Sequence, residues 1–189
     1  MNEPAAIWPL PIRIAHWLSA ALVISLLVLG AVMVFAVADP ARRFELTQIH
    51  KPLGILALIF TGARACCRLC SSAPKIALTS RPAVLAAKAA HLALYLLLFL
   101  MPLSGWLMVT STPIRIPVTL FGFVDLPFLL APDLATYNAA RTTHLFLSIA
   151  LALMVVVHTG AAMVHQFLWR DGTLARMWGP GRTPAPIVD

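Results

Sequence analysis

The chain has 189 residues, of which 60% are hydrophobic and 11% charged, and its mean hydropathy of +0.88 excludes an ordinary soluble globular domain. We therefore expect an integral membrane protein. The net charge of +7 does not indicate nucleic-acid binding, because the basic residues stand at the ends of apolar segments, where they set membrane orientation and meet lipid headgroups.

The first predicted span covers residues 14 to 37, with Arg13 and Trp17 as interfacial anchors at its mouth and His16 one turn inside. We expect this helix to be retained rather than cleaved as a signal peptide, because it contains histidine and tryptophan and no small-residue cleavage site stands out. A short polar turn at 38 to 47 should follow it.

The second predicted span covers residues 48 to 69 and carries basic residues at both ends. His50 and Lys51 open it. Arg64 and Arg68 lie at its far end, where long side chains can reach the headgroups instead of being buried without a partner.

The third predicted span covers residues 88 to 110, begins at Lys88 and has His91 as its only histidine. Residues 111 to 140 contain four prolines, so we do not expect them to span the bilayer. Within them, residues 120 to 130 are apolar and include three phenylalanines, which predicts an interfacial segment lying on the bilayer.

The fourth predicted span covers residues 142 to 169, and a polar tail follows from 170 to 189. His144 and His158 are 14 residues apart on this span, close to four helical turns. Both rings therefore leave the same face of the helix, about 21 Å apart along its axis. The sequence thus predicts an all-α fold, a single membrane domain built as a bundle of four transmembrane helices.

Four spans place both termini on one side of the membrane, and the distribution of basic residues indicates which side. The side of the termini holds nine of the 14 basic residues: Arg13, Arg64, Arg68, Lys75, Arg81, Lys88, Arg170, Arg176 and Arg182. The other side holds five: Arg42, Arg43, Lys51, Arg115 and Arg141. The positive-inside rule therefore predicts cytoplasmic termini.

This orientation sorts four histidines into two pairs by depth. His16 and His158 fall in the cytoplasmic half of the membrane, and His50 and His144 in the outer half. Imidazoles from facing helices can bind a haem iron in the core of a bundle, and ionisable residues inside spans are functional by default. The ordinary alternative for each one alone is an interfacial hydrogen-bonding residue.

Several cations are placed to hold the propionates of such a cofactor. Three of them each stand three positions before a histidine and on the same helix face: Arg13 before His16, Lys88 before His91 and Arg141 before His144. Arg64 follows His50 by 14 residues and shares its face, and Lys51 adjoins the same histidine. An interfacial anchor is an equally good interpretation of each cation.

Other kinds of chemistry lack the residues they need. Covalent haem attachment requires a histidine directly after the second cysteine of a pair. None follows Cys66, Cys67 or Cys70, and we therefore expect free thiols. We find no glycine-rich phosphate loop, no nucleophile elbow and no carboxylate pair inside a span, so the sequence does not favour a hydrolase, a nucleotide-dependent enzyme or a proton-coupled transporter.

An ordered set of motifs resembles the bacterial cytochrome b561 family. The motifs are Arg13-Ile14-Ala15-His16-Trp17, Ile49-His50-Lys51-Pro52-Leu53-Gly54, His91-Leu92-Ala93-Leu94-Tyr95, Pro102-Leu103-Ser104-Gly105-Trp106 and the paired histidines of the fourth span. The resemblance covers all four spans. It implies two b-type haems, with His16 and His158 as axial ligands to the inner haem and His50 and His144 to the outer one, in a bacterial inner membrane.

The resemblance also implies ubiquinone as a redox partner, and the members with this layout include one that oxidises superoxide at the outer face and passes the electron to ubiquinone. An alternative is a cytochrome b subunit that relays electrons for a separate periplasmic or membrane dehydrogenase, and a more distant one is a haem-free scaffold. His91 remains open at this stage as a replacement inner ligand, a quinone contact or a structural residue. His165 is expected at the headgroups.

Overall fold

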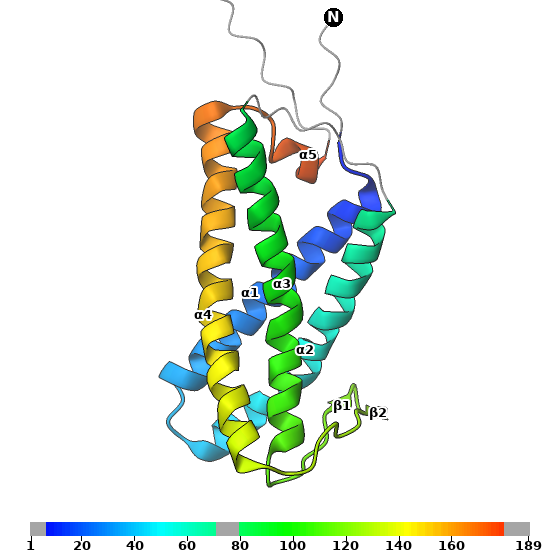
Figure 1. Ribbon diagram of the computed structural model, residues 1–189, viewed down its shortest axis with the longest axis vertical. Coiled ribbons are helices and arrows are strands. Elements are labelled where there is room, and N and C mark those ends of the chain that lie inside the picture. Colours follow the sequence, from blue (N-terminus) through cyan, green and yellow to red (C-terminus); the bar gives the residue numbers. More distant parts are fainter. Residues whose placement is uncertain (1–6, 71–79, 180–189) are drawn as a thin grey trace, which may run out of the picture.

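A computed structural model of the chain describes residues 7–70 and 80–179. Four long helices form its body: α1 (Leu10–Phe35), α2 (Pro40–Leu69), α3 (Arg81–Ser111) and α4 (Leu134–Val164) (Figure 1). All four are long and apolar enough to cross a membrane. The helical membrane fold expected from the sequence is therefore confirmed.

The helices pack in sequence order, with α1 against α2, α2 against α3, and α3 against α4. The start of α1 and the end of α4 lie at the same end of the bundle, which we call the terminal end (Figure 1). The opposite end carries a short antiparallel hairpin of β1 (Thr119–Leu120) and β2 (Val124–Asp125), and we call it the hairpin end.

The bundle is apolar outside and partly polar inside, the reverse of a soluble protein. Large hydrophobic side chains such as Val28, Phe146 and Val156 are exposed along the helices. Small hydroxyl side chains, among them Thr61, Thr110 and Ser111, are almost fully buried. Small polar residues let membrane helices approach closely, and Ser111 satisfies its hydroxyl on the carbonyl of Leu107.

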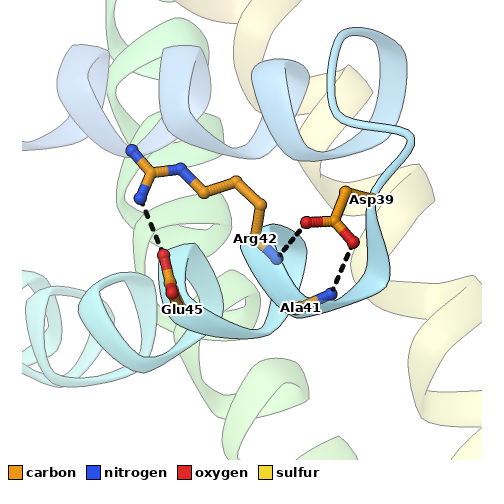
Figure 2. Close-up of polar contacts among 4 residues, drawn as sticks. All are labelled: Asp39, Ala41, Arg42 and Glu45. Carbon is orange, nitrogen blue, oxygen red and sulfur yellow. Dashed lines mark hydrogen bonds and ion pairs between the residues drawn. The ribbon is translucent and has the colours of Figure 1, made fainter.

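Aspartates cap two helices at the hairpin end. Asp39 accepts hydrogen bonds from the amides of Ala41 and Arg42 at 3.2 Å each, and Arg42 forms an ion pair with Glu45 (Figure 2). Pro40 after it suits the first helical position, so α2 begins eight residues before the predicted span. The polar turn expected at 38 to 47 is wrong for residues 40–47, which are helical.

Asp133 caps α4 in the same way, accepting from the amide of Thr136 at 2.7 Å and from its hydroxyl. These hydrogen bonds, the hydroxyl first, lower the pKa of the Asp133 carboxyl. Residues 134–140 are therefore helical, although we expected them in the connection that precedes the fourth span. Hydropathy marks the hydrocarbon part of a helix, whereas caps set where it begins.

The hairpin turns at Phe121 and Gly122, which both have positive φ angles, 51° and 78°. Three residues join the paired residues Leu120 and Val124, and the amide of Phe123 donates to the carbonyl of Leu120 at 3.0 Å. A positive φ angle is unusual for a bulky residue such as Phe121. Phe121 and Phe123 are 63% and 89% exposed at its tip. The segment does not span the membrane, as expected, but its strands were not predicted.

Candidate haem-binding sites

The predicted histidines come together as two pairs at opposite ends of the bundle. At the terminal end, the ring centroids of His16 on α1 and His158 on α4 are 6.3 Å apart. At the hairpin end, those of His50 on α2 and His144 on α4 are 6.4 Å apart. The two spacings agree within 0.1 Å, although different helices supply the partners of α4.

This spacing fits two imidazoles bound to opposite sides of one metal ion. A metal–nitrogen bond of about 2 Å on each side, and about 1 Å more from each nitrogen to its ring centre, places the centroids about 6 Å apart. In the described residues, no group of three or more His, Cys, Asp or Glu side chains is arranged to hold a metal ion. Two protein ligands suffice for haem, because its macrocycle supplies the other nitrogens.

The hydrogen bonds of His144 leave its other ring nitrogen available to a metal. Its Nδ1 lies 3.0 Å from the carbonyl oxygen of Met101 and 3.0 Å from the hydroxyl of Ser104. A carbonyl only accepts, so Nδ1 carries the proton and Nε2 keeps its lone pair. Metal-binding histidines commonly donate their second nitrogen in this way. Sequence reasoning missed Met101 and Ser104 as partners of this ring.

Four buried polar atoms, two of them in the histidine pairs themselves, lack a partner in the described structure. They are Nδ1 of His16, Nδ1 of His50, the hydroxyl of Ser19 one turn after His16, and Nε of Arg64. An unsatisfied buried polar group costs about 1–3 kcal/mol. Their location around the two pairs fits a group with its own polar substituents, such as haem with its propionates.

Two glycines lie against the imidazole rings of the hairpin-end pair. A methyl group at Gly105 would stand 3.0 Å from Cε1 of His144, and one at Gly30 would stand 3.9 Å from Cε1 of His50. At Gly54 and Gly160 an added methyl group would meet no atom within 4 Å. Gly105 thus lets α3 pack directly on the His144 ring.

Replacing Gly105 with alanine is expected to push on the His144 ring and to destabilise the protein by about 1–3 kcal/mol. Gly160→Ala is the matched control, because it adds the same methyl group on a helix where space is open, and helix propensity favours the change by about 1 kcal/mol. Thermal unfolding of the holoprotein compares them. Equal melting temperatures for both variants would contradict the steric role of Gly105.

His91 lies on α3 beside the terminal-end pair, with its ring centroid 5.7 Å from that of His158. Its Nδ1 donates to the carbonyl of Ala87 at 2.6 Å, so its Nε2 also keeps a lone pair. Three imidazoles thus meet at this end, and His158 has two alternative partners, His16 and His91. The spacing of His16 from His158 is the one that matches the hairpin-end pair.

The predicted cations lie in different surroundings. Arg64 is half-buried, with its guanidinium carbon 5.6 Å from the centre of the Tyr95 ring, and it interacts electrostatically with His16 and His158. Lys51 donates to the carbonyl of Pro117 at 3.3 Å. Lys88 and Arg141 are exposed, and Arg13 binds backbone carbonyls of the segment after α4.

The segment after α4 is folded, which the prediction of a polar tail missed. A π-helical turn, η1 (His165–Trp169), ends α4, and a short helix, α5 (Ala175–Trp178), follows. His165 donates to Asp171 at 2.5 Å. Although partial burial opposes it, the hydrogen bonds from His165 and Thr173 lower the pKa of Asp171. The apolar and aromatic residues between Leu174 and Trp178 could have indicated from the sequence that this segment packs on the bundle.

The cysteines agree with the expectation of free thiols. Cys66, Cys67 and Cys70 are unpaired and exposed at the terminal end of α2. Lys75 and Arg182, which contributed to the predicted orientation, lie outside the described residues.

Comparison with known proteins gives the same family as the motifs. A family model described as prokaryotic cytochrome b561 matches residues 7–180. The chain is also 36% identical to cytochrome b561 homolog 2 of Escherichia coli (strain K12) over 165 residues, which cover 87% of each protein. The match sets aside a haem-free scaffold. The chain therefore belongs to the prokaryotic cytochrome b561 family, and it is a multi-pass b-type cytochrome that binds haem b and transfers electrons in the bacterial inner membrane.

Proposed function

We propose that the chain is a single membrane domain that binds two b haems and carries electrons across the inner membrane between a donor at the outer face and ubiquinone. The observation that carries this proposal is the presence of two imidazole pairs with equal spacing, one toward each end of the bundle. His16 and His158 would hold the inner haem, and His50 and His144 the outer one.

The orientation rests on charge. The start of α1 and the end of α4 lie at one end of the bundle (Figure 1), and the described residues at that end include seven basic residues and one acidic residue, a net charge of +6. The hairpin end carries five basic and four acidic residues, a net charge of +1. The positive-inside rule therefore favours cytoplasmic termini and a hairpin that faces the periplasm.

The protein residues position and tune the cofactor. Haem, when bound, supplies a one-electron iron couple. His144 and His158 hold the two sites about 21 Å apart on one rigid helix. Arg64 is the best placed propionate partner at the inner site because it is half-buried beside it. Arg13, Lys88 and His91 are further candidates there, and Lys51 and Arg141 at the outer site.

Superoxide is the leading candidate donor. Lys51, Arg43 and Arg115 bind neutral carbonyls and so keep their positive charge available to an anion at the outer face. Ubiquinone would take the electron at the inner face, near His91, Arg81 and Lys88, where an imidazole can provide a proton. Lys75 belongs to the same predicted cluster but lies outside the described residues.

One observation favours a second candidate, a relay subunit for a separate dehydrogenase. The net charge of the hairpin end is close to zero, so its attraction for a small anion is local rather than spread over the whole face. The tip of the hairpin instead exposes two phenylalanines, the kind of side chain that is enriched in protein interfaces.

Purified protein supplied with enzymatically generated superoxide and a soluble ubiquinone analogue is expected to reduce the quinone. The reduced-minus-oxidised spectrum should show b-type bands, and haem analysis should give two haems per chain. Superoxide dismutase must abolish the quinone reduction. Failure with superoxide, together with copurification and reduction by a periplasmic dehydrogenase, would favour the relay subunit instead.

A further inference from the structure

We infer that the segment after α4 is a clasp that positions His16, and that it acts through Trp17 and Arg13; the inference rests on His16 being a ligand of the proposed inner haem. The clasp is the stretch from Arg176 to Trp178, which folds back from α4 onto the start of α1. It lies at the terminal end, where α5 sits beside the first turns of α1 (Figure 1).

Polar contacts fix the clasp to the amino-terminal end of α1. The carbonyl of Arg176 accepts from the amide of Trp8 at 3.2 Å. The carbonyl of Met177 accepts from Nε of Arg13 at 3.3 Å and from Nε1 of Trp17 at 3.0 Å. Arg13 also donates to the carbonyl of Trp178. Side chains of α1 thus satisfy the last two carbonyls of α5, those of Met177 and Trp178. Basic side chains commonly bind the free carbonyls at the end of a helix.

Ring contacts continue from the clasp to the ligand pair. The Trp178 ring stands 4.9 Å from the Trp17 ring, and the Trp17 ring stands 5.2 Å from the His16 ring. His16 in turn stands 6.3 Å from His158. The contacts of Trp17 with Trp178 and with His16 have the edge-to-face geometry that aromatic pairs prefer. The position of Trp178 is therefore transmitted to His16 through one intervening ring.

The packing of the bundle explains why such a device is needed. Helix α4 packs mainly on α3, and α1 packs mainly on α2, so the two helices that supply the terminal-end pair are not extensively packed on each other. The clasp connects the end of one to the start of the other. The hairpin-end pair differs, because Met101, Ser104 and Gly105 of α3 contact His144 directly.

The clasp also changes the interpretation of Arg13. Its Nε and one of its Nη atoms bind α5, and Gly179 leaves room for the guanidinium, since an added methyl group there would stand 2.5 Å from Nη2 of Arg13. A guanidinium has a second Nη atom with two further donors. Arg13 is thus a positioning residue first, and a propionate contact would use that second nitrogen.

The test measures haem release from the purified holoprotein to excess apomyoglobin, with electron paramagnetic resonance identifying the two haems. Trp178→Ala is expected to speed release of the inner haem roughly tenfold, because the ring contact that joins the clasp to Trp17 is lost, and to shift its low-spin signal. The outer haem should not change. Trp178→Phe keeps a ring and should restore slow release.

Trp169→Ala is the matched control, because Trp169 is exposed to a similar degree at the same end but contacts His165 rather than the clasp. Hydrogen exchange of the segment after α4 reports independently whether Arg13→Gln opens the clasp. Faster exchange without faster release of the inner haem would overturn the inference, as would equal loosening of both haems. If the wild type holds one haem, the dihaem proposal fails. The clasp is then supported only if Trp178→Ala speeds release of that haem more than Trp169→Ala does.

Discussion

Replacing His144 with alanine is expected to remove the haem at the hairpin end and to leave the other haem in place. His158→Ala is expected to do the reverse. The physical reason is that each histidine belongs to a different pair, 6.4 Å from His50 and 6.3 Å from His16 respectively. Each variant should keep about half of the b-type absorbance, because one of two irons loses its ligand.

Reductive titration and paramagnetic resonance of both variants identify which haem remains. His50→Ala should give the same remaining haem as His144→Ala, and His16→Ala the same as His158→Ala. The four single variants thus form two matched groups. Loss of the same haem from His144→Ala and His158→Ala would exclude the pairing by depth, whatever the level of electron transfer.

Comparison of His16→Ala with His91→Ala is expected to identify the second ligand of the inner haem. We expect His16→Ala to lose this haem, because its spacing from His158 matches the other pair whereas that of His91 is 5.7 Å. We expect His91→Ala to keep both low-spin haems and to lose quinone reduction by about 100-fold or more, as for removal of an acid–base group.

Spectra and quinone-reduction rates of the two variants must be measured on the same preparations. The contrary result is a high-spin inner haem in His91→Ala together with an intact spectrum in His16→Ala. In that case α3 rather than α1 supplies the ligand, and the clasp acts on a residue that does not bind iron. His165→Ala serves as a control for the loss of an imidazole at the same end of the bundle.

The four spans could be predicted because the bilayer requires long apolar stretches, and these are visible in the sequence. Helix ends were harder to predict. Asp39 followed by Pro40 is a readable start signal, but it lies outside the apolar stretch that defined the span. The hairpin could not be predicted, because its turn places Phe121 at a positive φ angle that residues of this type seldom adopt.

The candidate site was predictable to the extent that it depends on spacing along a helix. The 14-residue separation of His144 and His158 fixes a common face and two depths. Which helices face α4 at each depth is decided by packing, and for that reason His91 stayed open. The contacts of Met101 with His144 and of Met177 with Trp17 use backbone carbonyls, which no residue type in the sequence announces.

The three exposed thiols at the terminal end of α2 make the sidedness of this protein readable without an engineered tag. Cys66, Cys67 and Cys70 are the only cysteines in the chain, and all lie at the carboxyl-terminal end of α2, which belongs to the terminal end of the bundle. A maleimide that cannot cross a membrane therefore reacts from one side only. Labelling of inverted vesicles but not of intact spheroplasts would correspond to cytoplasmic termini, so the native chain carries its own topology reporter.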